Sequence, residues 1–240
     1  MDNIGAFDFE THEWVHPVCC GLRWRVDGRM YEHFICDDMH NWGSRSQKVA
    51  EEALQSMAVM PEVKVWYAHI MGKFDGLFIQ AAAHRLGWAM RAVIAGSNRV
   101  LEWTFTAPNG AKVVLRDSYA LIDSPLAKAA VSFELQSRKL FERGDYKTSP
   151  RTWGAVRLRQ GCIMDCQLVL ELLDKAETLI VGWGGKVKLT FSSSALTIIR
   201  VHLQERGKSL PDLRNKTELN ATARKAYYGA RVEVLHLLPD

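Results

Sequence analysis

The 240-residue sequence has few cysteines, and their arrangement is not that of a metal site. It holds five, none of them in a Cys-x-x-Cys pair, and their spacing does not suit four zinc ligands. We therefore expect reduced, mostly buried thiols rather than disulfides or a metal–thiolate centre. The five are Cys19, Cys20, Cys36, Cys162 and Cys166.

Long apolar runs are also missing. The sequence contains no run of about eighteen apolar residues, the length that crosses a membrane. Its first residues lack the basic segment and apolar stretch of a signal peptide. We expect an intracellular protein without a membrane partner, in the cytoplasm of a bacterial or phage-infected cell or in an organelle, and not secreted.

Neither sign of charge is in large excess, because 31 Lys+Arg and 27 Asp+Glu give a net charge of +4. The positive charge is concentrated in residues 137–160 and 206–231, each with seven basic and two acidic residues. Such stretches are typical of a polyanion-binding surface, but solvated helix faces have the same composition. Charge alone leaves both interpretations open.

The composition, 48% hydrophobic and 24% charged, is that of a globular protein. Apolar alternation and turn signals predict strands at 4–10, 18–26, 29–36, 63–69, 88–94, 100–106 and 111–118. Helical patterns predict helices at 46–57, 74–86, 126–133, 152–178, 190–203 and 219–226. We expect an α/β fold with a mixed sheet of about five strands flanked by helices. One domain would span residues 1–206, followed by a C-terminal extension over 207–240.

Acidic side chains stand out in the first predicted strand. Asp8 and Glu10 are two residues apart and so project from one face of the strand, whereas Phe7 and Phe9 point to the other face, into a core. Two neighbouring carboxylates are costly to bury unless a cation neutralises them. An exposed acidic strand face is the alternative for this pair alone.

Two further carboxylates occur at structured positions. Asp75 lies where a predicted strand leads into a helix, and Asp165 interrupts the apolar stripe of a long predicted helix. With Asp8 and Glu10 they could hold two Mg²⁺ or Mn²⁺ ions, which prefer oxygen ligands. Two such ions stabilise the attacking and leaving oxygens of a phosphodiester displacement.

At this point the sequence resembles a known family. FDFET at 7–11, YAH at 67–69 with FDGLFI at 74–79, and DCQ at 165–167 are similar to motifs I, II and III of the 3′→5′ proofreading exonuclease domain of family B DNA polymerases. The protein-primed subgroup of phages and linear plasmids is the nearest likeness. LRDSY at 115–119 with SPLA at 124–127, and YYGA at 227–230, resemble further segments of that subgroup in the same order.

The resemblance implies a ribonuclease-H-like fold of the DEDD exonuclease superfamily, with Asp8, Glu10, Asp75 and Asp165 as ligands of two Mg²⁺ or Mn²⁺ ions. It places a lysine that assists catalysis near residue 143, where Arg143 is the nearest match. It also implies contacts with a single-stranded DNA 3′ end by Thr11, Tyr67, His69, Phe74, Phe78, Ser118, Tyr119, Tyr146, Tyr227 and Gly229. Core packing is an equal alternative for Phe78, and nothing in the sequence decides between DNA and RNA.

The motif at residues 227–230 leads into a polymerase domain in the resembled family. None of that domain's motifs is present, so we expect no polymerase activity from this chain. The resemblance implies a polymerase domain in a longer parent chain, and a terminal protein, as partners.

Two positions depart from the family pattern. Ile70 stands where the family has a substrate-binding asparagine, and Gly161 stands where it has a tyrosine that positions the attacking water. Gln160 occupies the position at which the sister DEDD type has a histidine. The leading hypothesis is a metal-dependent 3′→5′ exodeoxyribonuclease that hydrolyses the terminal phosphodiester of single-stranded DNA. The alternatives are a catalytically impaired module of the same fold that binds the DNA 3′ end, and a domain without a nucleic-acid role.

Overall fold

The computed structural model describes residues 1–12, 14–36, 46–95, 99–141 and 154–209. Within these residues, seven strands form one sheet in the order β3-β2-β1-β4-β7-β6-β5. β4 pairs parallel with both β1 and β7, and the remaining neighbours are antiparallel. The expected mixed α/β sheet is confirmed. It is larger than the expected five or so strands, because the two outer hairpins stay hydrogen-bonded to it.

The elements follow the predicted segments closely. The strands are β1 (Ile4–His12), β2 (His16–Val26), β3 (Arg29–Cys36), β4 (Val65–Ala68), β5 (Ala89–Ala95), β6 (Arg99–Thr106) and β7 (Lys112–Asp117). The helices are α1 (Ser46–Ala58), α2 (Asp75–Arg85), α3 (Leu126–Ser132), α4 (Gly154–Gly182) and α5 (Phe191–Glu205). Two short 3₁₀ turns, η1 (Met71–Lys73) and η2 (Ser118–Ala120), follow β4 and β7. The helix expected at 219–226 lies outside the described residues.

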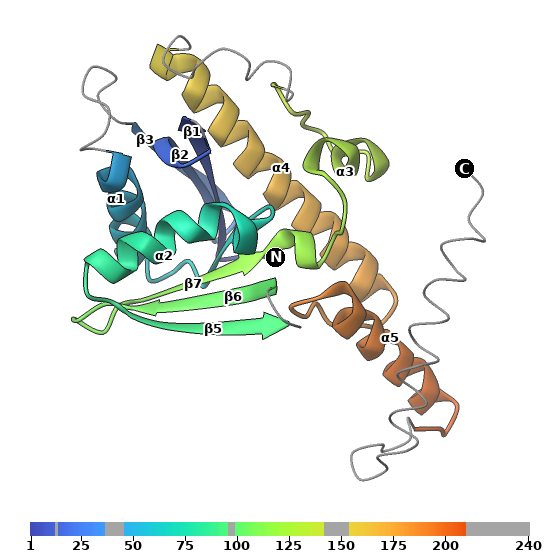
Figure 1. The fold of residues 1–240 in the computed structure, drawn as a ribbon. Coiled ribbons are helices and arrows are strands. Elements are labelled where there is room, and N and C mark those ends of the chain that lie inside the picture. The colour runs from blue at the N-terminus through green and yellow to red at the C-terminus, as the bar shows by residue number, and fades with distance from the viewer. Residues whose placement is uncertain (13, 37–45, 96–98, 142–153, 210–240) are drawn as a thin grey trace. The chain divides into compact units, whose positions relative to one another are not determined.

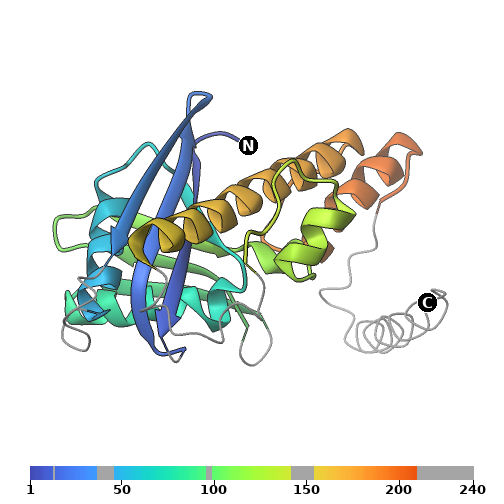
Figure 2. The same cartoon turned by 90° about the horizontal axis from the view of Figure 1, so that it is seen from above.

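Helices cover both faces of the sheet (Figures 1 and 2). On one face, α1 and α2 bury a cluster that includes Phe7, Phe9, Trp66 and Phe105. On the other face, α3 and α4 pack over Ile4, Ala6 and Tyr67. The alternation of β1 therefore directs its phenylalanines to the α1–α2 side, as the sequence predicted, and Asp8 and Glu10 to the α4 side.

A glycine in β2 allows α4 to lie close to the sheet. Gly21 pairs with Asp8 across the β1–β2 ladder. A Cβ at Gly21 would come within 2.7 Å of the Cβ of Cys162 on α4, so only glycine permits this approach. One turn further along α4, the Cys166 thiol donates to the Gly21 carbonyl at 3.4 Å. This close approach brings Asp165 towards the strand that carries Asp8.

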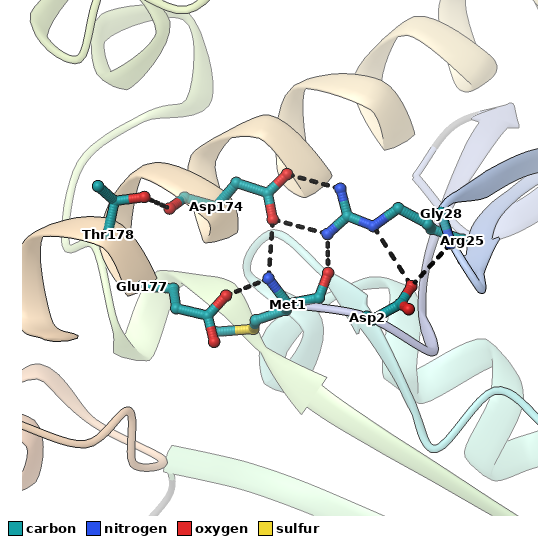
Figure 3. Close-up of polar contacts among 7 residues, drawn as sticks. All are labelled: Met1, Asp2, Arg25, Gly28, Asp174, Glu177 and Thr178. Carbon is teal, nitrogen blue, oxygen red and sulfur yellow. Dashed lines mark hydrogen bonds and ion pairs between the residues drawn. The ribbon is translucent and has the colours of Figure 1, made fainter.

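A polar network joins the later part of α4 to the N-terminal residues and to Arg25 near the end of β2 (Figure 3). The Arg25 guanidinium donates to both carboxylate oxygens of Asp174, at 2.8 and 2.7 Å. The Met1 amino group also contacts Asp174, at 3.1 Å, and pairs with Glu177. Bidentate pairing fixes direction as well as distance, so this network helps to set the angle at which α4 crosses the sheet.

The chain divides into two compact units, Met1–Ile198 and Ile199–Asp240. Of the second unit the structure describes residues 199–209, in which α5 ends at Glu205. The expected boundary between residues 206 and 207 stays a prediction, and Tyr227 and Gly229 lie outside the described residues. Among the helices that are described, none combines the length and apolarity needed to cross a membrane.

Candidate active site

Four carboxylates from three separate elements lie near the end of β1 and interact electrostatically. Asp8 and Glu10 come from β1, Asp75 is the first residue of α2, and Asp165 lies in α4. Glu10, Asp75 and Asp165 are 7, 3 and 7% exposed, and Asp8 is partly buried. Burial, then repulsion from Asp165, Asp75 and Glu10, raises the pKa of Asp8 well above its usual value. Electrostatic interactions thus link Asp8 to the other three carboxylates that the sequence singled out as metal ligands, and their metal-binding role stays a prediction.

The position of Asp75 follows from the point at which the pairing of β1 with β4 ends. β4 pairs with β1 only from Ile4 to Ala6, so the Phe9 amide lies beyond that pairing. It donates to the Asp75 carboxylate at 3.1 Å instead. Burial raises the pKa of Asp75 to about 7 even though this hydrogen bond opposes the shift. A backbone donor therefore fixes a carboxylate that burial alone would keep protonated.

Lys139 supplies a positive charge beside the cluster of carboxylates. It forms an ion pair with Asp165, and their side chains are 24 and 9% exposed. Burial works to lower the pKa of Lys139, but the carboxylates of Asp165, Asp8 and Glu10 raise it. The sequence interpretation took Arg143 as the nearest match to a catalytic lysine in this region. Arg143 lies outside the described residues, as does Tyr146, whereas Lys139 contacts the site directly.

A thiol, which the sequence analysis did not assign to this site, also lies beside the carboxylates. Ligand atoms of Asp8, Glu10 and Cys162 all lie within 4.8 Å of one another. The Cys162 sulfur is 3.6 Å from that of Cys19, and both cysteines are buried and free. Burial raises the pKa of Cys162, which keeps the thiol protonated. The sequence did offer a signal for the position of this thiol, because Cys162 and Asp165 are three residues apart and so share one helix face.

An aromatic ring fills the space beside Gly161. A Cβ at this position would lie 3.1 Å from the ring of Phe141 and 3.5 Å from a carboxylate oxygen of Glu10. The Phe141 ring in turn lies under the Arg157 guanidinium, 4.6 Å from its centroid. Position 161 therefore faces the carboxylates, as the resemblance implies for the tyrosine of the family, but a phenylalanine from another segment occupies the adjoining space.

Three of the residues expected to bind DNA have internal partners. Tyr67 is 4% exposed and packs in the core on the α4 side. The ring nitrogens of His69 lie 3.0 Å from the Ser118 hydroxyl and 2.9 Å from the Ser124 carbonyl. Burial lowers the pKa of His69 to about 4, so the ring is neutral near pH 7. Ser118 is fully buried. In this structure these side chains connect β4 to the segment after β7.

Ile70, at the position of the family's asparagine, has a left-handed backbone, with φ 65° and ψ 29°. A β-branched residue rarely adopts this conformation, whereas asparagine does so readily. The next amide, of Met71, donates to the buried Asp117 carboxylate at 3.2 Å, and the Ile70 carbonyl accepts from Lys73 at 3.0 Å. The surrounding hydrogen bonds therefore hold a strained residue in place.

The remaining expected contacts are partly exposed. Thr11 follows a bulge in the β1–β2 ladder directly after Glu10. The rings of Phe74 and Phe78 pack edge to face, with centroids 5.3 Å apart. Tyr119 lies beside Arg99, whose guanidinium is 5.7 Å from its ring centroid. Bulges are common next to active sites, because they redirect side chains at the end of a strand.

No protein-family model matches the sequence, and neither does any curated protein. Solved structures do match. Phi29 DNA polymerase complexed with single-stranded DNA has a TM-score of 0.59 and 16% identity, covering 80% of this chain and 34% of that chain. The same polymerase complexed with primer-template DNA and incoming nucleotide substrates has a TM-score of 0.57 and 17% identity, covering 85 and 35%.

The chain thus spans about a third of the length of the solved structures that it matches. At this level of identity the likeness shows the fold. That fold is the ribonuclease-H-like α/β arrangement expected from the sequence, and it is shared with a polymerase of the protein-primed family B type.

Proposed function

We propose that the chain is a metal-dependent 3′→5′ exonuclease domain that removes nucleotides from single-stranded DNA. The observation that carries the proposal is the convergence of Asp8, Glu10, Asp75 and Asp165 from β1, α2 and α4. The fold shared with Phi29 DNA polymerase, which has been solved in complexes with single-stranded and with primer-template DNA, supports a DNA substrate. A polymerase domain in a longer parent chain and a terminal protein remain proposed partners.

The donor atoms suit Mg²⁺ or Mn²⁺. Carboxylate oxygens are the ligands that these ions prefer, and four of them converge from partly or fully buried residues. Burial raises the pKa of Asp8 and Asp75, and repulsion between the carboxylates adds to this effect. Such a cluster favours a bound cation, because two positive ions remove both the repulsion and the cost of burial.

Bound divalent ions would lower the barrier to phosphodiester hydrolysis by polarising the phosphate and activating a water. The residues of the chain have separate tasks around them. Asp8 and Asp165 would hold the ions from opposite elements, and the Phe9 amide keeps Asp75 directed at the site. Lys139, paired with Asp165, would place an ammonium near the negative phosphate.

A second candidate is a module that binds a DNA 3′ end without cutting it. The observation in its favour is that the Phe141 ring occupies the space beside Gly161, where the family has its water-positioning tyrosine. Strained Ile70 in place of the asparagine also changes the expected contacts with the strand. Such a module would retain the metal ligands but would not hydrolyse the strand.

The test is a gel assay of 5′-labelled single-stranded DNA with Mg²⁺ or Mn²⁺. The controls are Asp8→Asn and Asp165→Asn, which keep the side-chain volume but remove a ligand charge. Exonuclease activity predicts a ladder of shortened products that needs the metal and disappears in both variants. An intact strand that still shifts in a binding gel would favour the non-cutting module. An intact strand without binding would refute both candidates.

Thermal unfolding separates a metal site from a surface acid group. If the carboxylates hold ions, Mn²⁺ raises the melting temperature of the wild type and has little effect on Asp165→Asn. An equal response of both proteins would contradict the metal site, whatever the gel assay shows.

A further inference from the structure

A row of aromatic rings runs from the core to the surface beside the carboxylate site. Phe9 contacts Phe78, Phe78 contacts Phe74, and Phe74 contacts Trp14, with centroids 5.5, 5.3 and 5.8 Å apart. The first ring is buried and the last is 69% exposed. Phe74 directly precedes the candidate ligand Asp75. The row therefore ends in an indole that packs on the residue preceding Asp75 and faces solvent.

The backbone at Trp14 is unusual for so large a residue. Its φ is 63°, in the left-handed region, within the turn that joins β1 to β2. The Val15 amide donates to the His12 carbonyl at 3.2 Å and closes this turn. Bulky residues seldom adopt this conformation, which costs roughly 1–2 kcal/mol. Glycine or asparagine would relieve the strain, and a tryptophan that is 69% exposed gains little burial in return.

Trp14 is also within reach of a strand bound at the carboxylates. It follows Glu10 by four residues, which corresponds to roughly 13 Å at most in an extended strand. Its edge-to-face contact with Phe74 fixes the ring from one side and leaves most of its surface open. The exposed Lys73 directly precedes Phe74 and adds a positive charge suited to a phosphate. An ordered aromatic face beside a basic group is the arrangement with which proteins stack single-stranded bases.

We propose that Trp14 stacks against a nucleobase close to the 3′ end of the bound single strand and so positions the terminal phosphodiester. The role rests on the proposed function, because it needs a strand at the carboxylates. Trp14 acts here as a positioning residue, since the ring lies beside Phe74 rather than among the ligands. Phe74 supports the indole from behind, and the partly buried ring of Phe78, packed on the buried Phe9, holds Phe74 in place.

The test uses the full chain and a 5′-fluorescent oligothymidylate, with Ca²⁺ in place of Mg²⁺ so that oxygen ligands are satisfied while the strand is kept for a binding measurement. The variants are Trp14→Ala and Trp14→Phe. The matched control is Trp183→Ala, which removes an indole that is 58% exposed beyond the end of α4. Trp14→Ala should weaken binding about 5- to 150-fold, the range that corresponds to one stacked base. Trp14→Phe should recover most of the affinity, and the control should bind like the wild type.

Abasic nucleotides, introduced one at a time from the 3′ end, then locate the contact. In the wild type, one abasic position should weaken binding by a factor similar to that of Trp14→Ala. In Trp14→Ala the same position should have no further effect. Unchanged affinity of Trp14→Ala, or equal sensitivity to every abasic position in both proteins, would refute the stacking role but leave the exonuclease proposal standing. A wild-type chain that neither binds nor cuts the strand would refute both.

Discussion

Lys139 provides a quantitative test of the charge balance at the site. Its ammonium pairs with Asp165 in a setting where the two side chains are 24 and 9% exposed. Replacing it by methionine keeps the aliphatic stem but leaves Asp165 unpaired, next to Asp8 and Glu10. Removing one partner of a buried pair costs about 3–5 kcal/mol, and the partial exposure of Lys139 reduces this to about 2–3 kcal/mol.

The expected result depends on metal. In EDTA, Lys139→Met should lower the free energy of unfolding by about 2–3 kcal/mol, which for a chain of this size lowers the melting temperature by about 5–10 °C. In saturating Mn²⁺ the loss should shrink to below about 1 kcal/mol. The reason is that bound cations replace the missing charge and so bind the variant more tightly than the wild type; at saturation a hundredfold lower Kd restores about 2.7 kcal/mol.

The assay is urea unfolding followed by circular dichroism, with and without Mn²⁺. Lys139→Arg retains the charge and should behave nearly as the wild type in EDTA. Lys128→Met, at an exposed position of α3, controls for the loss of a lysine elsewhere. An equal loss for Lys139→Met in EDTA and in Mn²⁺ would refute the reasoning, because it would mean that Lys139 stabilises the fold without sharing its carboxylates with a cation.

Three further predictions concern residues around the site. Ile70→Asn should raise the free energy of unfolding by about 1 kcal/mol in thermal melts, because asparagine adopts the left-handed backbone at less cost; an unchanged or lower stability would contradict the strain. Gly161→Tyr alone should not increase the rate of hydrolysis, because the Phe141 ring fills the adjoining space. The double variant Gly161→Tyr/Phe141→Ala should cut faster than Gly161→Tyr; equal rates of the two variants in a timed gel assay would count against this steric account. The buried ring of His69 has a pKa lowered to about 4, so its contribution to stability is full above about pH 6.5 and is lost as the pH falls towards 4; relative to His69→Gln, the wild type should lose about 3 kcal/mol over that range in urea unfolding, and parallel pH profiles would exclude it.

Local periodicity was sufficient to predict the described helices and strands and the orientation of the side chains of β1. Alternation alone assigned Phe7 and Phe9 to one face and Asp8 and Glu10 to the other, and the burial of the two phenylalanines confirms that register. The number of strands in the sheet could not be predicted in the same way. Each hairpin signal identifies a pair of strands, but whether the pair stays attached to the sheet depends on packing against helices that lie far away in the sequence.

The residues around the carboxylates show where sequence reasoning ends. Lys139 and Arg143 lie in the same basic stretch, and only the path of the chain after α3 brings Lys139 into contact with Asp165, while Arg143 lies outside the described residues. The ring of Phe141 beside Gly161 comes from a segment twenty residues earlier, so no spacing rule connects the two. Trp14 carried no motif at all, and its exposure and left-handed backbone became visible only in three dimensions.

The geometry separates two properties that the resembled family combines. The carboxylates are held by β1, by the hydrogen bond from the Phe9 amide to Asp75 at the start of α2, and by the close approach of α4 at Gly21. None of these supports involves the side chain at position 161, because glycine has none. The proposed metal binding would therefore not depend on the position where the family has its water-orienting tyrosine, whereas the proposed hydrolysis would. A chain that binds Mn²⁺ and a DNA 3′ end but cuts slowly would locate its defect at Gly161 and Phe141, and a chain that cuts rapidly must orient water with another group. Measuring metal-dependent stability and hydrolysis on the same preparations distinguishes these two cases.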